Sequence, residues 1–184
     1  MVLLLTKELT YTMLEQNPEI DAIVEEAVQI ATHYNHSFVT VEHVLMALMK
    51  TENFTTMMKE YGVDYNNLYN ELVNIIETRF SDIIDESKPT PKKTHALERV
   101  FSRAFTQVLF SGRQKFQTID LYISITNESN SYAAWLMRKY GVEQEALIDF
   151  YNKEYCGPND KHGVQNKALQ ILEEFCTNLN TLVD

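Results

Sequence analysis

The sequence has few residues that interrupt regular backbone structure. Its 184 positions hold only 5 glycines and 4 prolines, so most of the chain can form helices or strands. Cysteine is also scarce, because Cys156 and Cys176 are the only two and fit neither a CxxC nor a zinc-ribbon spacing. We therefore expect free thiols in a reducing cytoplasm rather than a disulfide framework.

Long apolar runs and excess positive charge are missing as well. The opening MVLLLT is short, has no basic residues before it and is followed at once by Lys7 and Glu8, so neither a signal peptide nor a membrane span is predicted. The formal net charge of −10 disfavours binding to the phosphate backbone of nucleic acids and docking on anionic membranes. The composition is that of a globular protein. The negative charge suits a soluble protein that meets protein partners, and solubility by itself also accounts for it.

Catalytic signatures are absent from the sequence. It contains no Walker A motif GxxxxGK[ST], no HExxH and no GxSxG, and it shows no nucleophile–base or paired-carboxylate arrangement. ATP binding through a phosphate loop is therefore excluded. An enzyme is the least favoured class, and no cofactor is expected.

What the sequence does contain is helical periodicity. Apolar residues recur at helical spacing over 20–34 and again from Leu97 to Val108. Thr40 is placed to cap a helix that begins with VEHVLMALM, Gly62 follows a short helix from Phe54 to Tyr61, and Asp64 can cap the next one. The segment SDIIDESKPTPKKT, 81–94, reads as a linker, CGPNDKHG is a second break, and the tail from Val164 predicts one more amphipathic helix.

Two parts of the sequence resemble each other. FVTVEHVLMALM aligns with FQTIDLYISITN when Phe38, Thr40 and Glu42 are set against Phe116, Thr118 and Asp120. MMKEYGVDYNNL aligns with LMRKYGVEQEAL, and the helix around Ala27 with the one around Ala104. A helical unit at 20–79 therefore recurs at 95–154, and two facing four-helix units are the natural packing.

These residues also carry a family resemblance. HSFVTVEHVLMALM, LERVFSRAFTQVLFSGR and YAAWLMRKYGV resemble the Clp repeat domain at the front of ClpA-type unfoldases, and LEEFCTNLNTLV is similar to the helix that opens their first ATPase module. The resemblance implies an all-α fold of two tandem pseudo-symmetric four-helix repeats plus a C-terminal amphipathic helix. We accordingly divide the chain into an N-terminal extension (1–19), a double repeat domain (20–154, with the linker at 81–94) and a linker with its tail helix (155–184).

The resemblance implies a function in regulated proteolysis rather than catalysis. In ClpA-type unfoldases this domain binds the ClpS adaptor and helps deliver substrates, so ClpS-like adaptors, substrate proteins or Clp unfoldase subunits are the expected partners of a cytoplasmic docking domain. Ser37 stands where the similar protein has an acid. The positions that match the adaptor-facing or substrate-facing surface are His36, Ser37, Glu42, Thr94, Arg99, Arg103 and Asp120.

Glu42 has two interpretations. As a residue of the first helical turn, its charge would meet the positive end of the helix dipole, and Thr118 with Asp120 would do the same in the second repeat. Alternatively, as in ClpC-type relatives, the acid would line a groove that holds phosphorylated arginine. Arg99 and Arg103 lie one turn apart and could instead form a solvated face, paired with Glu98, Glu25 or Glu26.

The histidines and the aromatic residues can each be interpreted as structural or as functional. His33 and His36, with Glu77 as a partner brought by the fold, are weak candidates for a metal site, and an ordinary structural role is favoured. The aromatic residues are expected mainly in the core, with a hydrophobic peptide groove as the alternative; they are Phe101, Phe105, Phe110, Phe116 and Trp135.

Two further functions compete with adaptor docking. A free-standing relative without the motor, which the sequence slightly favours over a fragment, could act as a decoy that sequesters the adaptor or substrates of a host Clp protease. The amphipathic tail could instead make the chain an assembly protein that oligomerises.

Overall fold

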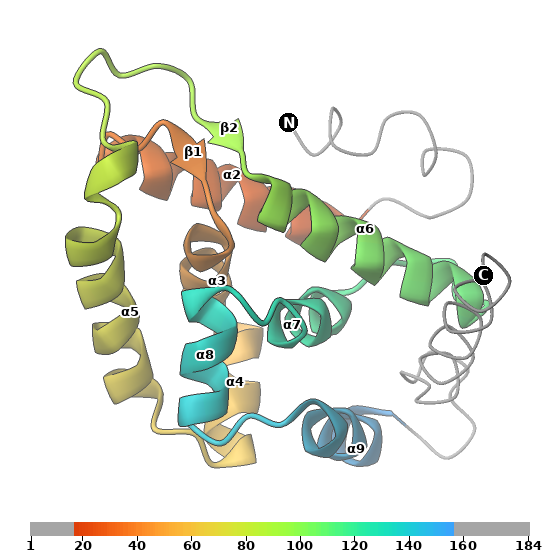
Figure 1. Ribbon diagram of the computed structural model, residues 1–184. Coiled ribbons are helices and arrows are strands. Elements are labelled where there is room, and N and C mark those ends of the chain that lie inside the picture. The colour runs from red at the N-terminus through yellow and green to blue at the C-terminus, as the bar shows by residue number, and fades with distance from the viewer. Residues whose placement is uncertain (1–16, 157–184) are drawn as a thin grey trace, which may run out of the picture.

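The computed structural model describes residues 17–156 of the chain, so the expected tail helix, Cys176 and most of the N-terminal extension lie outside the described residues. The described part is built from helices, with two very short strands (Figure 1). In chain order the elements are α2 (Pro18–His33), β1 (Phe38–Val39), α3 (Val41–Met49), α4 (Glu52–Tyr61), α5 (Tyr65–Arg79), a 3-10 turn (Ser81–Ile83), β2 (Lys92–Lys93), α6 (His95–Phe110), α7 (Thr118–Thr126), α8 (Tyr132–Lys139) and α9 (Gln144–Tyr155). The predicted all-α fold is confirmed.

Local sequence signals explain where several helices begin and end. Asp64 caps α5 by accepting a hydrogen bond from the Asn67 N–H, and Thr94 caps α6 in the same way through the Leu97 N–H. Gly62 caps the C-terminal end of α4 with φ of 97°, and Gly141 follows the C-cap Tyr140 of α8 with φ of 80°. Both have a left-handed conformation that other residues adopt only at a cost. These positions therefore fix the two Tyr-Gly-Val turns.

The two repeats correspond element by element. A shift of 77 residues takes α2 onto α6 and α3 onto α7, with both ends of each helix in register. The connection that follows is longer in the second repeat: two residues, 50–51, join α3 to α4, whereas five residues, 127–131, join α7 to α8. The connection ahead of α8 is therefore three residues longer, and because the Gly62 and Gly141 turns align at a shift of 79, the net insertion in the second repeat is two residues.

This correspondence corrects the alignment expected from the sequence. The shift of 77 pairs Thr40 with Gln117 and His43 with Asp120, one position away from the predicted pairing of Thr40 with Thr118 and Glu42 with Asp120. Gln117, not Thr118, is the N-cap of α7, and its N–H donates to the Asp120 carboxylate. The shared Thr-x-acid letters were misleading because the cap changed from threonine to glutamine.

The segment between the repeats is more ordered than a plain linker. Strand β2 pairs in parallel with β1, and the Ser37 N–H donates to the Ile83 carbonyl at 2.7 Å. The Lys92 N–H donates in turn to the Ser37 carbonyl at 2.9 Å. The proline-containing segment is thereby fastened to the loop that precedes α3, a non-local contact that turn composition did not reveal.

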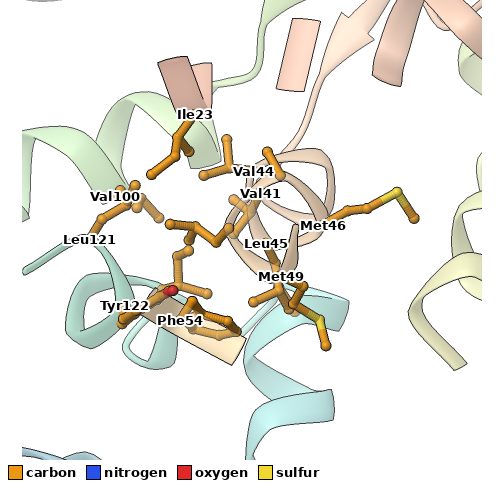
Figure 2. Packing of buried hydrophobic residues seen from close by; sticks show 14 of the residues in the cluster. Ile23, Val41, Val44, Leu45, Met46, Met49, Phe54, Val100, Leu121 and Tyr122 are labelled. Carbon is orange, nitrogen blue, oxygen red and sulfur yellow. The ribbon is translucent and has the colours of Figure 1, made fainter. Parts of the chain in front are cut away.

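One apolar core serves both repeats. All nine residues of α3 are buried, as are eight of the nine residues of α7. Figure 2 shows side chains of α2, α3 and α4 from the first repeat gathered against Val100, Leu121 and Tyr122 from the second. Because neither repeat closes its core alone, the two are expected to fold as one unit.

Candidate protein-binding surface

The strand pair brings two predicted surface residues together from distant parts of the chain. Ser37 precedes β1 and Thr94 follows β2, and the Thr94 N–H donates to the Val39 carbonyl at 3.2 Å. The Ser37 hydroxyl is bound to the Ile83 carbonyl, and Thr94 caps α6. Both residues therefore sit at the end of the fold where α6 begins (Figure 1).

Arg99 and Arg103 on α6 converge on one carboxylate. Arg99 Nη2 lies 2.6 Å from Glu128 Oε1, and Arg103 Nη2 lies 2.9 Å from Glu128 Oε2 and 3.2 Å from the Ser124 carbonyl oxygen. Glu128 belongs to the α7–α8 connection and is buried, whereas the Arg99 side chain is 57% exposed. The alternative pairing with Glu98, Glu25 or Glu26 is not the observed one, because the partner lies 29 residues beyond Arg99.

Arg99, Arg103 and Glu128 stabilise one another's charged forms. Burial alone would raise the pKa of Glu128, but the two guanidinium groups outweigh it and hold that pKa below its usual range. The Glu128 carboxylate in turn raises the pKa of Arg99. The cluster presents guanidinium N–H donors at the surface in a fixed orientation, an arrangement suited to carbonyl or carboxylate groups of a partner.

Glu42 contacts the opposite repeat. Its side chain is buried, and Oε1 accepts a hydrogen bond of 3.1 Å from the Ala133 N–H in the first turn of α8. Neither predicted setting, the dipole of its own helix or a phosphoarginine groove, includes this contact. The carboxylate joins the two repeats by meeting the positive end of α8.

Asp120 lies away from the other predicted surface residues. It is buried at the start of α7 and forms a two-point ion pair with Arg113, whose Nη1 lies 3.2 Å from Oδ2. Burial raises the pKa of Asp120, while Arg113 and the Gln117 N–H act against that shift. Since Arg113 follows the C-terminal end of α6 and Thr94 precedes its start, about 24 Å of helix separate the two places.

His36 and His43 form a buried neutral pair. The Thr40 N–H donates to His43 Nδ1 at 2.9 Å, so His43 carries its proton on Nε2 and donates it to His36 Nδ1, also at 2.9 Å. Burial lowers the pKa of His36, and burial together with His36 lowers the pKa of His43 to about 3. Like Glu42 and Asp120, His36 is therefore buried and offers little side-chain surface to a partner.

The suggested metal ligands do not come together. His33 is exposed and packs edge-on against Tyr34, His36 faces His43, and Glu77 raises the pKa of Tyr34 after the larger effect of burial. Within residues 17–156 there is no group of three or more His, Cys, Asp or Glu side chains placed to hold a metal ion. The structural role of these histidines is thus the better description.

A groove runs between α5 and α8. It encloses about 550 Å³ and is lined by Glu71, Asn74, Ile75, Arg79, Ser129, Asn130, Ser131, Tyr132 and Trp135. Trp135 is 45% exposed and Tyr132 42% exposed, which is unusual for aromatic residues on a helix this close to the core. Figure 1 shows α5 and α8 as neighbours along this side of the molecule.

The expected core position of the aromatic residues is confirmed for some and wrong for others. Phe101 and Phe116 are buried and Phe105 packs partly buried against the core. Phe110 is 62% exposed, and Trp135 lies open to the groove. One signal was available: when the two Tyr-Gly-Val turns are aligned, Tyr132 and Trp135 correspond to Asn53 and Thr56 of α4, so the repeat does not need aromatic side chains there.

Comparison with known proteins agrees with the duplicated helical architecture. A family model for the Clp repeat (R) N-terminal domain matches residues 16–140. The chain belongs to this family. As a Clp repeat domain it is 27% identical over 142 residues to a ClpA homolog protein of Fuscovulum blasticum, covering 73% of this chain and 18% of that relative. The chain therefore spans about a fifth of the length of the curated relative it matches.

Solved structures show the same fold. The Hsp104 N-terminal domain from Candida albicans superposes with a TM-score of 0.65 at 11% identity, covering 83% of this chain and 99% of that domain. A ClpV N-domain in complex with a VipB peptide superposes with a TM-score of 0.58 at 15% identity, covering 81% of this Clp repeat domain and 88% of that chain. Among the described residues, no helix is long and apolar enough to cross a membrane.

Proposed function

We propose that this Clp repeat domain is a non-catalytic docking domain that binds a ClpS-like adaptor or a substrate protein for regulated proteolysis. The observation that carries the proposal is the cluster of Arg99 and Arg103 on Glu128, next to the edge formed by Ser37 and Thr94. The peptide bound to the ClpV N-domain supports a docking role for this fold in general. The choice of an adaptor rests on the family resemblance of these surface positions.

The geometry suits a protein ligand for two reasons. Arg99 is exposed, yet its guanidinium is already oriented by Glu128, so a partner gains hydrogen bonds without ordering a long free side chain. Ser37 and Thr94 flank the β1–β2 pair and are tied to it by backbone hydrogen bonds, so the neighbouring surface is rigid. A rigid surface with oriented donors favours specific contacts over general electrostatic attraction.

Calorimetric titration with a ClpS-type adaptor from the source cell tests the proposal. We expect saturable binding by the full chain, and weakening on the order of tenfold in Arg99→Ala, because truncating an anchor residue of an interface commonly costs more than 1 kcal/mol. Lys153→Ala, an exposed cation on α9, serves as the matched control and should bind like the unmodified chain.

Two results would contradict adaptor docking. A folded chain that releases no heat with the adaptor at any tested concentration would remove the adaptor as the partner. Equal affinities for the Arg99→Ala and Lys153→Ala variants would show that the adaptor binds elsewhere. Circular dichroism of each variant confirms that a loss of binding is not a loss of fold.

A further inference from the structure

We propose that the groove between α5 and α8 is a second docking site, which takes an acidic amphipathic segment of a partner protein. A large apolar side chain of that segment packs against Trp135 and Tyr132, and a carboxylate near it pairs with Arg79. This inference concerns a surface other than the Arg99–Arg103 cluster and does not depend on the adaptor proposal.

The groove has the size and the chemical mixture of a peptide site. Its volume of about 550 Å³ accommodates a few side chains. Ile75 and the two aromatic residues provide apolar surface, while Asn74, Ser129 and Asn130 offer polar groups around it. Aromatic residues with an adjacent arginine form the combination most enriched at protein-binding hot spots.

The repeated fold does not require aromatic side chains at the positions of Tyr132 and Trp135. The Tyr-Gly-Val turns that follow α4 and α8 make the same backbone hydrogen bonds, and when they are aligned the corresponding positions of α4 hold Asn53 and Thr56. The fold therefore tolerates polar side chains at these two places. Tyr132 packs against Phe80, and the Lys139 ammonium lies 5.1 Å from the centre of the Trp135 ring. Tyr132 and Trp135 nevertheless remain 42% and 45% exposed, which points to a partner that covers them.

Charge decides which kind of partner fits. Glu71 is already bound by Lys139 at 2.6 Å and by the Tyr140 hydroxyl at 2.8 Å, which hold its pKa below the usual range. Arg79 forms no salt bridge within residues 17–156, so its guanidinium is the unpaired charge of the groove. In a chain with a net charge of −10, this groove is a local site for a carboxylate.

The corresponding cleft of the other repeat has a different character. The space between α4 and α9 is lined by Glu19 and Glu52, together with Lys115 and the tyrosines of α9. Two carboxylates at its rim disfavour an acidic segment. The preference for an acidic partner is therefore expected of the α5–α8 groove and not of its counterpart.

The single tryptophan makes the test specific to the groove, because Trp135 is the only one in the sequence. The probes are two tryptophan-free, alanine-based helical peptides that differ only in charge. Each carries one phenylalanine, with glutamates in one peptide and lysines in the other at positions three and four residues after it. Titration of the full chain at low salt is followed by Trp135 fluorescence.

We expect the glutamate peptide to shift Trp135 emission to shorter wavelength with saturation, and the lysine peptide to have little effect. Arg79→Glu should weaken the glutamate peptide on the order of tenfold and favour the lysine peptide, because it replaces attraction with repulsion. Lys153→Glu changes the net charge by the same amount at a distant place and should leave both titrations unchanged.

A second variant removes the apolar contact. Trp135→Thr installs the residue of the corresponding α4 position, and calorimetry should then detect no binding of the glutamate peptide by a chain whose circular dichroism is unchanged. Equal responses to the two peptides, an unaltered titration in Arg79→Glu, or no emission change at millimolar peptide would each overturn the proposal. Adaptor binding measured alongside with Arg99→Ala separates a failure here from a failure of the first surface.

Discussion

Each repeat begins its central helix with a capping box, in which the N-cap residue and the residue three positions later hydrogen-bond each other, but the residues of the two boxes differ in chemistry. In the first repeat Thr40 and His43 cap α3, and His43 contacts His36; in the second Gln117 and Asp120 cap α7, and Asp120 contacts Arg113. Both contacts join residues seven positions apart. The first repeat buries a neutral pair of imidazoles, and the second buries a charged pair of a guanidinium and a carboxylate. The same arrangement of capping residue and partner is therefore held by a neutral hydrogen bond in one repeat and by an ion pair in the other.

The largest expected loss of stability comes from breaking the buried ion pair between Arg113 and Asp120. Arg113→Ala leaves the buried Asp120 carboxylate without its partner and should lower the free energy of unfolding by about 3–5 kcal/mol. His36→Ala, the matched change in the first repeat, leaves a neutral N–H unpaired and should cost about 1–3 kcal/mol. Urea unfolding of both variants measures the difference, and equal losses would contradict the distinction between the two boxes.

The next expected effect is a dependence of folding stability on pH, which arises from the histidine pair of the first repeat. Because His43 has a folded pKa of about 3, the unfolded chain binds protons that the folded chain does not once pH falls below about 6.5. Stability should therefore decrease by about 1.5 kcal/mol between pH 6.5 and 5 through His43, with His36 adding to it.

His43→Gln separates this effect from other titrations. The amide keeps an acceptor for the Thr40 N–H but cannot be protonated in this range, so the slope of stability against pH should fall. Glu71 and Glu128 have lowered pKa values and reduce stability only as pH falls below about 4.5, outside the window. An unchanged slope in His43→Gln, measured by urea unfolding at several pH values, would contradict the assignment.

These two boxes also show how far the sequence could predict the structure. Caps and turns such as Asp64 and Gly62 were predicted, because the residue and its hydrogen-bond partner are close in the chain. Arg99 with Glu128, Glu42 with Ala133 and β1 with β2 join distant segments, and nothing local encodes such contacts. The repeat alignment failed by one residue for a related reason, since only the observed hydrogen bonds show that Gln117 replaces Thr40.

A smaller loss of stability is expected at the contact between Glu42 and α8, which has no counterpart from the second repeat to the first. Glu42 binds the first turn of α8, whereas its counterpart under the 77-residue shift is Ile119, which has no carboxylate to offer α4. Glu42→Gln keeps an oxygen acceptor but removes the charge at the helix end, so a loss of about 0.3–1 kcal/mol is expected. An unchanged midpoint in thermal unfolding of Glu42→Gln would contradict the importance of that charge.

The smallest effect, and one of opposite sign, is expected at Tyr122. This residue corresponds to Leu45 of the first repeat, and its hydroxyl is buried without a hydrogen-bond partner within residues 17–156. Tyr122→Phe removes a polar group that folding desolvates without compensation, so stability should stay equal or rise by up to about 1 kcal/mol. A clear loss in urea unfolding would indicate that the hydroxyl has an acceptor.

The longer connection before α8 has a consequence for stoichiometry. A protein made of two equal halves would offer every partner two equal sites and would bind two copies. The longer connection supplies Glu128, which orients Arg99 and Arg103, and Ser129 and Asn130, which line the groove beside Trp135. Both surfaces thus exist once per chain, and each should saturate at one partner molecule per domain.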